Sequence, residues 1–192
     1  MKKKISGLIV AIICIGLVVG AYYYLSSSRA GKNVENGTEL TEVEKVLAKD
    51  LEKSYPMTPR EVVTFYNRIL GCLYNEEYTD DQLHGLSEKM RMLMDEELKE
   101  VNMEDEFFEN LKKEAASFTL QGKKIATTTV SDSNDVQYKT VGGRECAYVN
   151  ASYFMKEGDN GDFSRTTQCY VLRKDEAENW KILGFSLVGG ED

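Results

Sequence analysis

Histidine is almost missing from this 192-residue sequence, which contains only His84. Cysteine is scarce too, and no two of the four cysteines have the Cys-x-x-Cys spacing. Protein zinc sites are built from several thiolate or imidazole ligands, commonly at such short spacings. The sequence therefore predicts no metal centre, and it offers no motif for a cofactor.

Positive charge is also in short supply. The chain has 24 Lys and Arg against 32 Asp and Glu, a net charge of -8, and three of its lysines lie within the first four residues. Proteins that bind nucleic acid neutralise phosphates with Lys and Arg, and no basic stripe is present here. We therefore expect no nucleic-acid partner.

Acidic residues gather instead in one stretch of the chain. Such residues near helix ends are usually solvated and interact with the helix dipole, which is the interpretation favoured here. The alternative is that they attract a cation or a basic partner. The residues concerned are Asp95, Glu96, Glu97, Glu100, Glu104, Asp105, Glu106 and Glu109.

One long apolar run is present, from Ile5 to Leu25, and it contains no charged residue. About 20 such residues cross a bilayer as a helix. Because lysines precede the run and few positive charges follow it, we expect a cytoplasmic N-terminus and an extracytoplasmic remainder. Residues 1–25 are thus predicted to be a single-pass anchor in the cell membrane. The alternative is a signal peptide cleaved before Gly31, although its apolar part is typically only about 7 to 15 residues.

A short polar stalk over residues 26–37 and a connecting helix within residues 38–54 are predicted next. The spacing of Thr41 and Glu44 is that of a capping box. The apolar stripe of this helix is too short for a coiled coil, so we expect it to pack on the domain that follows. Residues 55–192 are expected to form one extracytoplasmic domain, because the chain is too short for a second.

Three more helices are predicted, each from a capping residue followed by apolar residues at helical spacing. Thr58 is expected to cap the first, with Pro59 in its first turn and Glu61 reaching back to the cap. Thr79 is expected to cap the second, and the third is expected to begin between residues 102 and 105.

Strands follow the helices. Between Ala147 and Met155 every second residue is apolar and inward-facing, as in a strand with one face on a core. Short polar turns join only antiparallel neighbours, so the sheet is predicted to be antiparallel. The prediction is an α+β fold in which helices pack on a curved sheet of about five strands. These strands are expected within residues 120–131, 135–141, 144–156, 163–174 and 180–188.

The segment TPREVVTFY that begins at Thr58, and NWKILGF that ends at Phe185, resemble the nuclear-transport-factor-2-like superfamily. The likeness covers residues 55–188 and is greatest to membrane-anchored bacterial members without an assigned function. It implies a cone in which a curved sheet wraps helices and encloses a cavity. Ketosteroid isomerases and scytalone dehydratases of that superfamily carry Asp, His, Tyr or Arg in the cone. None of their catalytic sets matches this sequence, so the resemblance implies a fold rather than an activity.

Three cysteines lie beyond the predicted anchor, where disulfides can form. Cys146 and Cys169 fall on neighbouring strands, but a turn near Asp159 places Cys146 opposite Arg173. We therefore expect Cys146, Cys169 and Cys72 to be three buried thiols rather than to include a disulfide.

Two classes of function remain, with a hydratase or isomerase as a less favoured third. The first is a non-catalytic interaction module that meets an envelope protein or polymer. The alternative is capture of a small ligand in the cone, with the hydroxyls of Tyr66, Tyr148 and Tyr170 as polar contacts. No catalytic residue is predicted, because His84 has no partner that the sequence can identify.

Overall fold

The structure, a computed structural model, describes residues 39–158 and 162–188. The chain divides into two units after Leu40, and the fold below is that of the second. The predicted anchor and stalk, residues 1–37, lie outside the described residues. Within the described ranges, no helix is both long and apolar enough to cross a bilayer.

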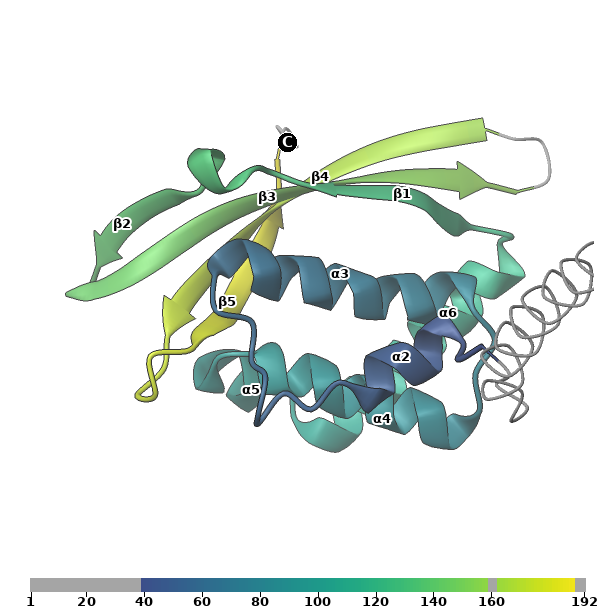
Figure 1. Ribbon diagram of the computed structural model, residues 1–192. Coiled ribbons are helices and arrows are strands. Elements are labelled where there is room, and N and C mark those ends of the chain that lie inside the picture. Colours follow the sequence, from purple (N-terminus) through teal and green to yellow (C-terminus); the bar gives the residue numbers. More distant parts are fainter. Residues whose placement is uncertain (1–38, 159–161, 189–192) are drawn as a thin grey trace, which may run out of the picture. The chain divides into compact units, whose positions relative to one another are not determined.

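Five α-helices precede the strands in the described part of the chain (Figure 1). The predicted capping boxes of Thr41, Thr58 and Thr79 are all present, and each such cap is worth about 1 kcal/mol of stability. The helices are α2 (Glu42–Ala48), α3 (Pro59–Asn75), α4 (Asp80–Leu93), α5 (Glu96–Val101) and α6 (Glu104–Leu120).

The connecting helix α2 is shorter than predicted, because Lys49 already has an extended backbone. Val43 and Val46 on α2 are fully buried in the core, as expected for a helix that packs on its own domain. α5 was not predicted. It has only six residues, none of them buried, so it lacks the apolar periodicity that identifies longer helices.

The described residues form one antiparallel sheet of five strands, as predicted. The predicted first strand begins too early, since α6 continues to Leu120 and Gly122, with a φ of 61°, turns the chain afterwards. The strands are β1 (Lys124–Val130), β2 (Gln137–Val141), β3 (Arg144–Glu157), β4 (Asp162–Lys174) and β5 (Trp180–Leu187).

The last three strands form the predicted meander, β3-β4-β5, whereas β1 and β2 share one edge of β3. β1 pairs with the second half of β3, and β2 pairs with its first half through the predicted turn at Gly142 and Gly143. The register between β3 and β4 is the predicted one, with Cys146 opposite Arg173. Residues 159–161, in the turn between β3 and β4, lie outside the described residues.

The three cysteines of the described residues, Cys72, Cys146 and Cys169, are free thiols, as expected. Cys72 and Cys146 are buried, but Cys169 is only half-buried, so burial was predicted correctly for two of the three.

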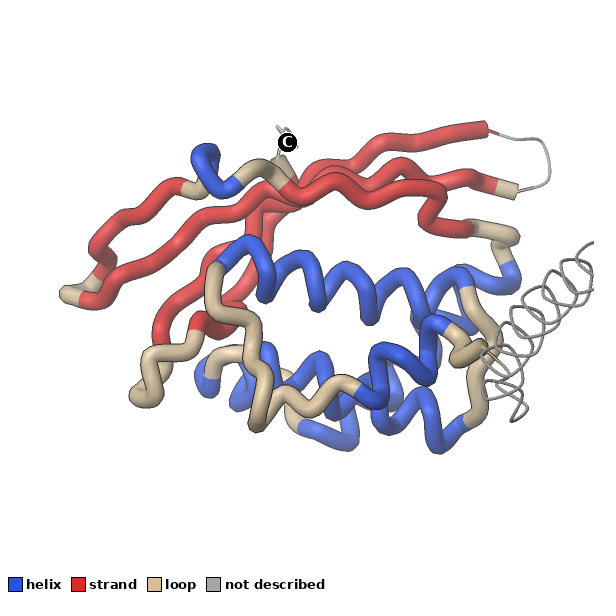
Figure 2. Tube along the Cα trace, viewed as in Figure 1, coloured by secondary structure: helices blue, strands red, loops and turns tan. Residues whose placement is uncertain are grey.

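The helices gather on one face of the sheet (Figure 2), and α3 contacts β1, β3 and β5 directly. α4 and α6 pack against α3 from the side away from the strands. The core draws on all these layers, and its buried residues all lie between Val43 and Ile182. The unit that begins at Thr41 therefore has a complete core of its own.

The prediction that the acidic stretch is solvated is wrong for Asp95, which is only 4% exposed. Its side chain accepts hydrogen bonds from the backbone N–H of Glu97 and from Arg173, whose Nε lies 3.0 Å away. Burial alone would raise the pKa of the Asp95 carboxyl, but the hydrogen bonds from Arg173 and Glu97 outweigh burial and hold that pKa below its usual range. The sequence does not reveal this partner, since Arg173 lies 78 residues away.

We expect Asp95→Asn to lower the free energy of unfolding by about 1 to 3 kcal/mol, since it removes the charged hydrogen bonds between Asp95 and Arg173 and leaves Glu97, a more exposed carboxylate, as the partner of that guanidinium. Asparagine keeps the helix cap, so the effect reports the lost charge. Urea denaturation at neutral pH measures it. The matched control is Asp80→Asn, which removes an exposed ion pair with Lys112 and should cost less than about 1 kcal/mol.

The same pair predicts how stability depends on pH. Because the pKa of Asp95 is lowered on folding, its stabilising contribution is present above the unfolded pKa of about 4 and is lost as the pH falls below that value. Asp95→Asn should therefore flatten the loss of stability in acid. An unchanged acid limb in Asp95→Asn would contradict the assigned role of this carboxylate.

Candidate functional site

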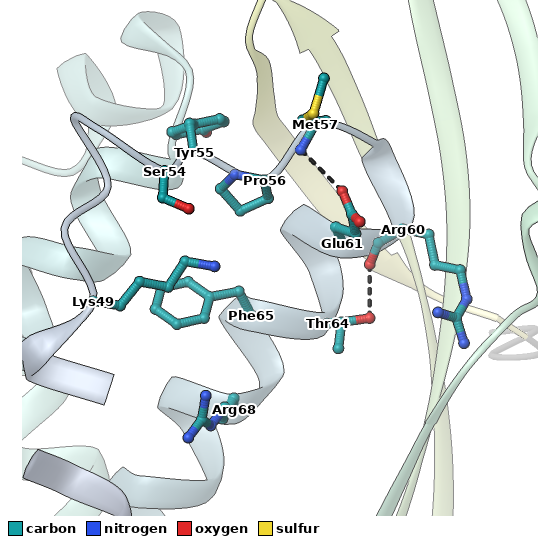
Figure 3. A pocket seen from close by; sticks show the side chains of 10 residues that line it. All are labelled: Lys49, Ser54, Tyr55, Pro56, Met57, Arg60, Glu61, Thr64, Phe65 and Arg68. Carbon is teal, nitrogen blue, oxygen red and sulfur yellow. Dashed lines mark hydrogen bonds between the residues drawn. The ribbon is translucent and has the colours of Figure 1, made fainter. Parts of the chain in front are cut away.

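Two hollows of similar size lie on opposite sides of α3. The first is a groove of about 440 Å³ between residues 49–57 and α3 (Figure 3). Its charged groups serve the local structure: Glu61 accepts a hydrogen bond from the backbone N–H of Met57, and Arg68 pairs with Glu42 of α2. These contacts fasten the connecting segment to α3, which explains the groove without a ligand.

The second hollow, called the inner cavity below, has a volume of about 420 Å³ and lies between the helices and the β4-β5 part of the sheet. A smaller lobe of about 170 Å³ adjoins it and shares Leu70, Tyr74, Glu114 and Gln168 as lining residues. The inner cavity is lined by Tyr66, Leu70, Tyr74, Met90, Met94, Leu98, Asn102, Phe107, Leu111, Glu114, Gln168, Tyr170, Gly184 and Phe185.

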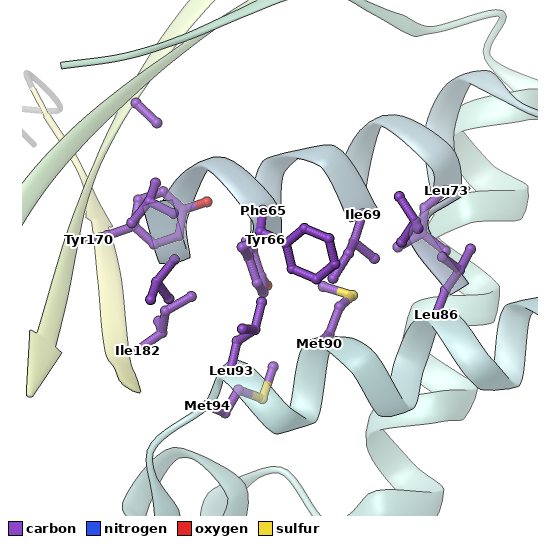
Figure 4. Packing of buried hydrophobic residues seen from close by; sticks show 14 of the residues in the cluster. Phe65, Tyr66, Ile69, Leu73, Leu86, Met90, Leu93, Met94, Tyr170 and Ile182 are labelled. Atoms are coloured by element: carbon purple, nitrogen blue, oxygen red, sulfur yellow. The ribbon is translucent and has the colours of Figure 1, made fainter. Parts of the chain in front are cut away.

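Aromatic rings form much of this lining. Tyr66 of α3 and Tyr170 of β4 are both buried, and their rings meet edge to face with centroids 5.8 Å apart. Tyr170 lies with Ile182 at the sheet end of the core, and Tyr66 lies farther along toward Met90 (Figure 4). Phe185 contacts the ring of Tyr170 and is 52% exposed, so it lies at the mouth of the cavity.

One carboxylate lines the cavity, that of Glu114, an exposed residue of α6. It accepts a hydrogen bond of 2.7 Å from the hydroxyl of Tyr74, whose ring stacks on Phe118 with centroids 4.1 Å apart. Burial and the neighbouring carboxylate of Glu114 raise the pKa of Tyr74 well above its ordinary value. The Tyr74 hydroxyl therefore stays protonated at neutral pH, and Glu114 is held in place by a permanent donor.

A chain of buried hydrogen bonds runs along the sheet side of the cavity. The hydroxyls of Tyr153 and Tyr170 lie 2.5 Å apart, Tyr153 also contacts the side-chain oxygen of Asn67 at 2.5 Å, and Tyr170 contacts that of Gln168 at 3.0 Å. Burial raises the pKa of Tyr153 to about 12, and burial also raises that of Tyr170. Both hydroxyls are therefore protonated at neutral pH and act as donors.

Both amides of this chain are placed with their oxygens toward a tyrosine hydroxyl, so each of the chain's two proton orders requires one amide to turn over. The chain's three contacts need three hydrogen atoms, but the two hydroxyls supply only two, so an amide must donate the third. If Asn67 donates, Tyr170 donates to the oxygen of Gln168 and leaves the Gln168 amide N–H groups free. If Gln168 donates, its oxygen is left free and Tyr153 donates to Asn67. The two proton orders thus change whether Gln168 offers the cavity a donor or an acceptor.

Asn67 is the last residue in this series of hydrogen bonds. It is 6% exposed, and its side-chain nitrogen, as placed with the oxygen toward Tyr153, has no hydrogen-bond partner among the described residues. A buried amide group without a hydrogen-bond partner lowers the stability of the fold by about 1 to 3 kcal/mol, so its presence needs an explanation.

The structure brings together two of the three predicted ligand contacts. Tyr66 and Tyr170 line the inner cavity, whereas Tyr148 does not and instead lies under the Lys139 ammonium, 4.9 Å from its ring centroid. Tyr148 alternates with buried Ala147 and Val149, which places it on the opposite face of β3. His84 is exposed on α4 beside Glu88, away from the residues that line the cavity.

Glu114 was missed from sequence. Tyr153 lines the smaller lobe, and it continues the period-two series of inward-facing residues from Ala147. Glu114 follows Phe107 and Leu111 at intervals of four and three, so helical spacing alone places all three on one side of α6. Within the described ranges, no group of three or more His, Cys, Asp or Glu side chains is arranged to hold a metal ion.

Comparison with solved structures finds a de novo β-sheet design protein determined by solution NMR. It shares 16% sequence identity, the match covers 69% of this chain and 90% of the design, and the TM-score is 0.34. A likeness this weak carries no information about function. No curated protein matches the chain.

A family model spans nearly the whole sequence. It matches residues 1–185, and its description is a domain of unknown function, DUF6715. On this match, the chain belongs to the DUF6715 family.

Proposed function

We propose that the domain from Thr41 onward binds a small molecule in the inner cavity. The observation that supports this most directly is a space of about 420 Å³ at the predicted tyrosines Tyr66 and Tyr170. Small-molecule sites are typically apolar hollows of about 300 to 1,000 Å³ with a few polar groups that converge on the ligand. The inner cavity has this composition, with Asn102, Glu114 and Gln168 and the tyrosine hydroxyls among its polar groups.

The inner cavity reaches into the core, because Tyr66, Leu111, Met90 and Tyr170 of its lining are all buried. Protein interiors are normally packed like organic crystals, and an unfilled hollow among core residues loses stability. Retention of the cavity in this setting favours ligand binding over the interaction module.

Binding without catalysis is the proposed mode. A general base must lose its proton near the working pH, but burial raises the pKa of the Tyr66, Tyr153 and Tyr170 hydroxyls. These groups therefore serve as hydrogen-bonding contacts. The ligand would be bound between the aromatic rings and released unchanged.

We further propose that residues 5–25 anchor the domain in the cell membrane, with the N-terminus in the cytoplasm and the cone-like domain outside. The support is the uncharged apolar run itself and the lysines that precede it. Membership of the nuclear-transport-factor-2-like superfamily remains a prediction of the same kind.

A neutral apolar dye tests ligand binding. Nile red added to residues 38–192 should show saturable fluorescence, because the dye moves from water into an apolar site. Leu70→Trp, which adds bulk in the wall between the two lobes, should weaken the apparent affinity at least about tenfold. Fluorescence titration measures both, with circular dichroism to check that the variant is folded.

The matched control is Leu120→Trp, the same substitution at the 88% exposed end of α6, which should bind the dye as the unmodified domain does. Leu98→Trp adds the same bulk from α5 if Leu70→Trp does not fold. Absence of saturable fluorescence, or equal binding by the cavity variants and the control, would sink the proposed function.

Membrane extraction tests the anchor. The full chain expressed in bacteria should stay in the membrane fraction after an alkaline carbonate wash, because only the apolar run in the bilayer holds it there. Removing residues 1–25 should release it into the soluble fraction. Release of the full-length chain by the wash would contradict the proposed anchor.

A further inference from the structure

We propose that the ligand of the inner cavity is an apolar amine, bound as an organic ammonium ion. This inference rests on the proposed function and adds the chemical class of the ligand. It comes from the charge of the cavity, the state of its one carboxylate, and the aromatic faces beside it.

The charge of the lining has one sign. Among the described residues that line the inner cavity and its lobe there is no Lys, Arg or His, and Glu114 is the single charged side chain. An anionic ligand would lie beside this carboxylate with no cation in the wall to offset the repulsion. The lining therefore selects against carboxylates and phosphates.

Glu114 has room for a second partner. One of its carboxylate oxygens accepts the hydrogen bond from Tyr74, and among the described residues Glu114 forms no ion pair. A carboxylate can accept several hydrogen bonds, and bonds from a charged donor are the strongest of these. An ammonium group at the free oxygen would supply both the hydrogen bond and the opposite charge.

The aromatic rings offer a second source of attraction. A cation within about 6 Å of an aromatic face is attracted by the ring quadrupole, most strongly when water is excluded. Tyr66, Tyr74, Phe107, Tyr170 and Phe185 all line the cavity. The protein already uses this interaction at the rim, where the Arg91 guanidinium lies 5.9 Å from the centroid of the Phe107 ring.

Arg91 does not itself supply an anion site in the cavity. It is not among the lining residues, and its Nη1 donates a hydrogen bond of 2.6 Å to the backbone oxygen of Asn102. The Arg91 guanidinium is thus held by the backbone oxygen of Asn102 and by the Phe107 ring.

Three of the four tyrosine hydroxyls around the cavity and its lobe already have hydrogen-bond partners, whereas that of Tyr66 has none among the described residues and can accept from a ligand or donate to it. The proton of Tyr74 is used by Glu114, and those of Tyr153 and Tyr170 are used within the buried hydrogen-bond chain. In the structure Tyr170 donates to the side-chain oxygen of Gln168, and this oxygen becomes free to accept from the ligand only if the Gln168 amide turns over and donates to Tyr170 instead. An ammonium ion would therefore favour that proton order and gain a second acceptor beside Glu114.

Three ligands with the same aromatic body but different head groups test the assignment. Phenethylamine is a cation at neutral pH, phenethyl alcohol is neutral, and hydrocinnamate is an anion. Isothermal titration calorimetry on residues 38–192, which contain the whole core, should show phenethylamine binding at least about tenfold more tightly than hydrocinnamate. Phenethyl alcohol should fall between the two.

Two variants separate the local carboxylate from the overall negative charge of the protein. Glu114→Gln keeps an oxygen for Tyr74 but removes the charge, so the preference for the amine should fall to about twofold or less. Glu109 of α6 is exposed, as Glu114 is, but it does not line the cavity or its lobe, so Glu109→Gln makes the same change and should keep the full preference.

The outcomes distinguish this inference from the proposed function. If all three ligands bind equally, or the preference survives in Glu114→Gln, the amine assignment is overturned while cavity binding stands. If hydrocinnamate binds best, the assignment is likewise overturned. If none of the three ligands binds and Nile red also fails to bind, it is the proposed function that fails.

Discussion

The buried hydrogen bonds that join Asn67 of α3 to Tyr153 of β3 and Tyr170 of β4 are the contact on which the candidate site depends. Polar atoms inside a protein must be satisfied, since an unpaired one costs about 1 to 3 kcal/mol. The two tyrosine rings are therefore held in fixed positions between the helix and the sheet. Tyr170 in turn contacts both Tyr66 and Phe185, so its position defines the wall and the mouth of the inner cavity.

The same side chains, Asn67, Tyr153 and Tyr170, both hold α3 to the sheet and shape the candidate site. Because burial keeps the hydroxyls of Tyr153 and Tyr170 protonated, these hydrogen bonds persist across the neutral pH range. Their proton order determines what Gln168 offers to the cavity. A ligand that binds better to one of the two proton orders would therefore shift the hydrogen bonds that connect α3 to the sheet toward that order.

Elements set by local chemistry were predictable from sequence. The capping boxes at Thr41, Thr58 and Thr79 depend on residues three apart, and the hairpin at Gly142 depends on two adjacent glycines. The register that places Cys146 opposite Arg173 followed from the turn between two strands.

What the sequence concealed involves partners far apart along the chain. The pair of Asp95 and Arg173, like the contact between Asn67 and Tyr153, exists only after the helices have packed on the sheet. Tyr66 and Tyr170 were identified because large aromatic residues with a polar tip are common in binding sites. Tyr148 met the same criterion, but the alternation of β3 turns it to the other face.

A crystal structure of residues 38–192, purified without added ligand, tests the central claim most directly. The account predicts an open space beside Tyr66 and Tyr170 that contains water or a captured molecule, with an acceptor of Glu114 or Gln168 turned toward it. Side chains of Phe107 and Phe185 folded into that space, packed at the usual density of a protein interior, would contradict it.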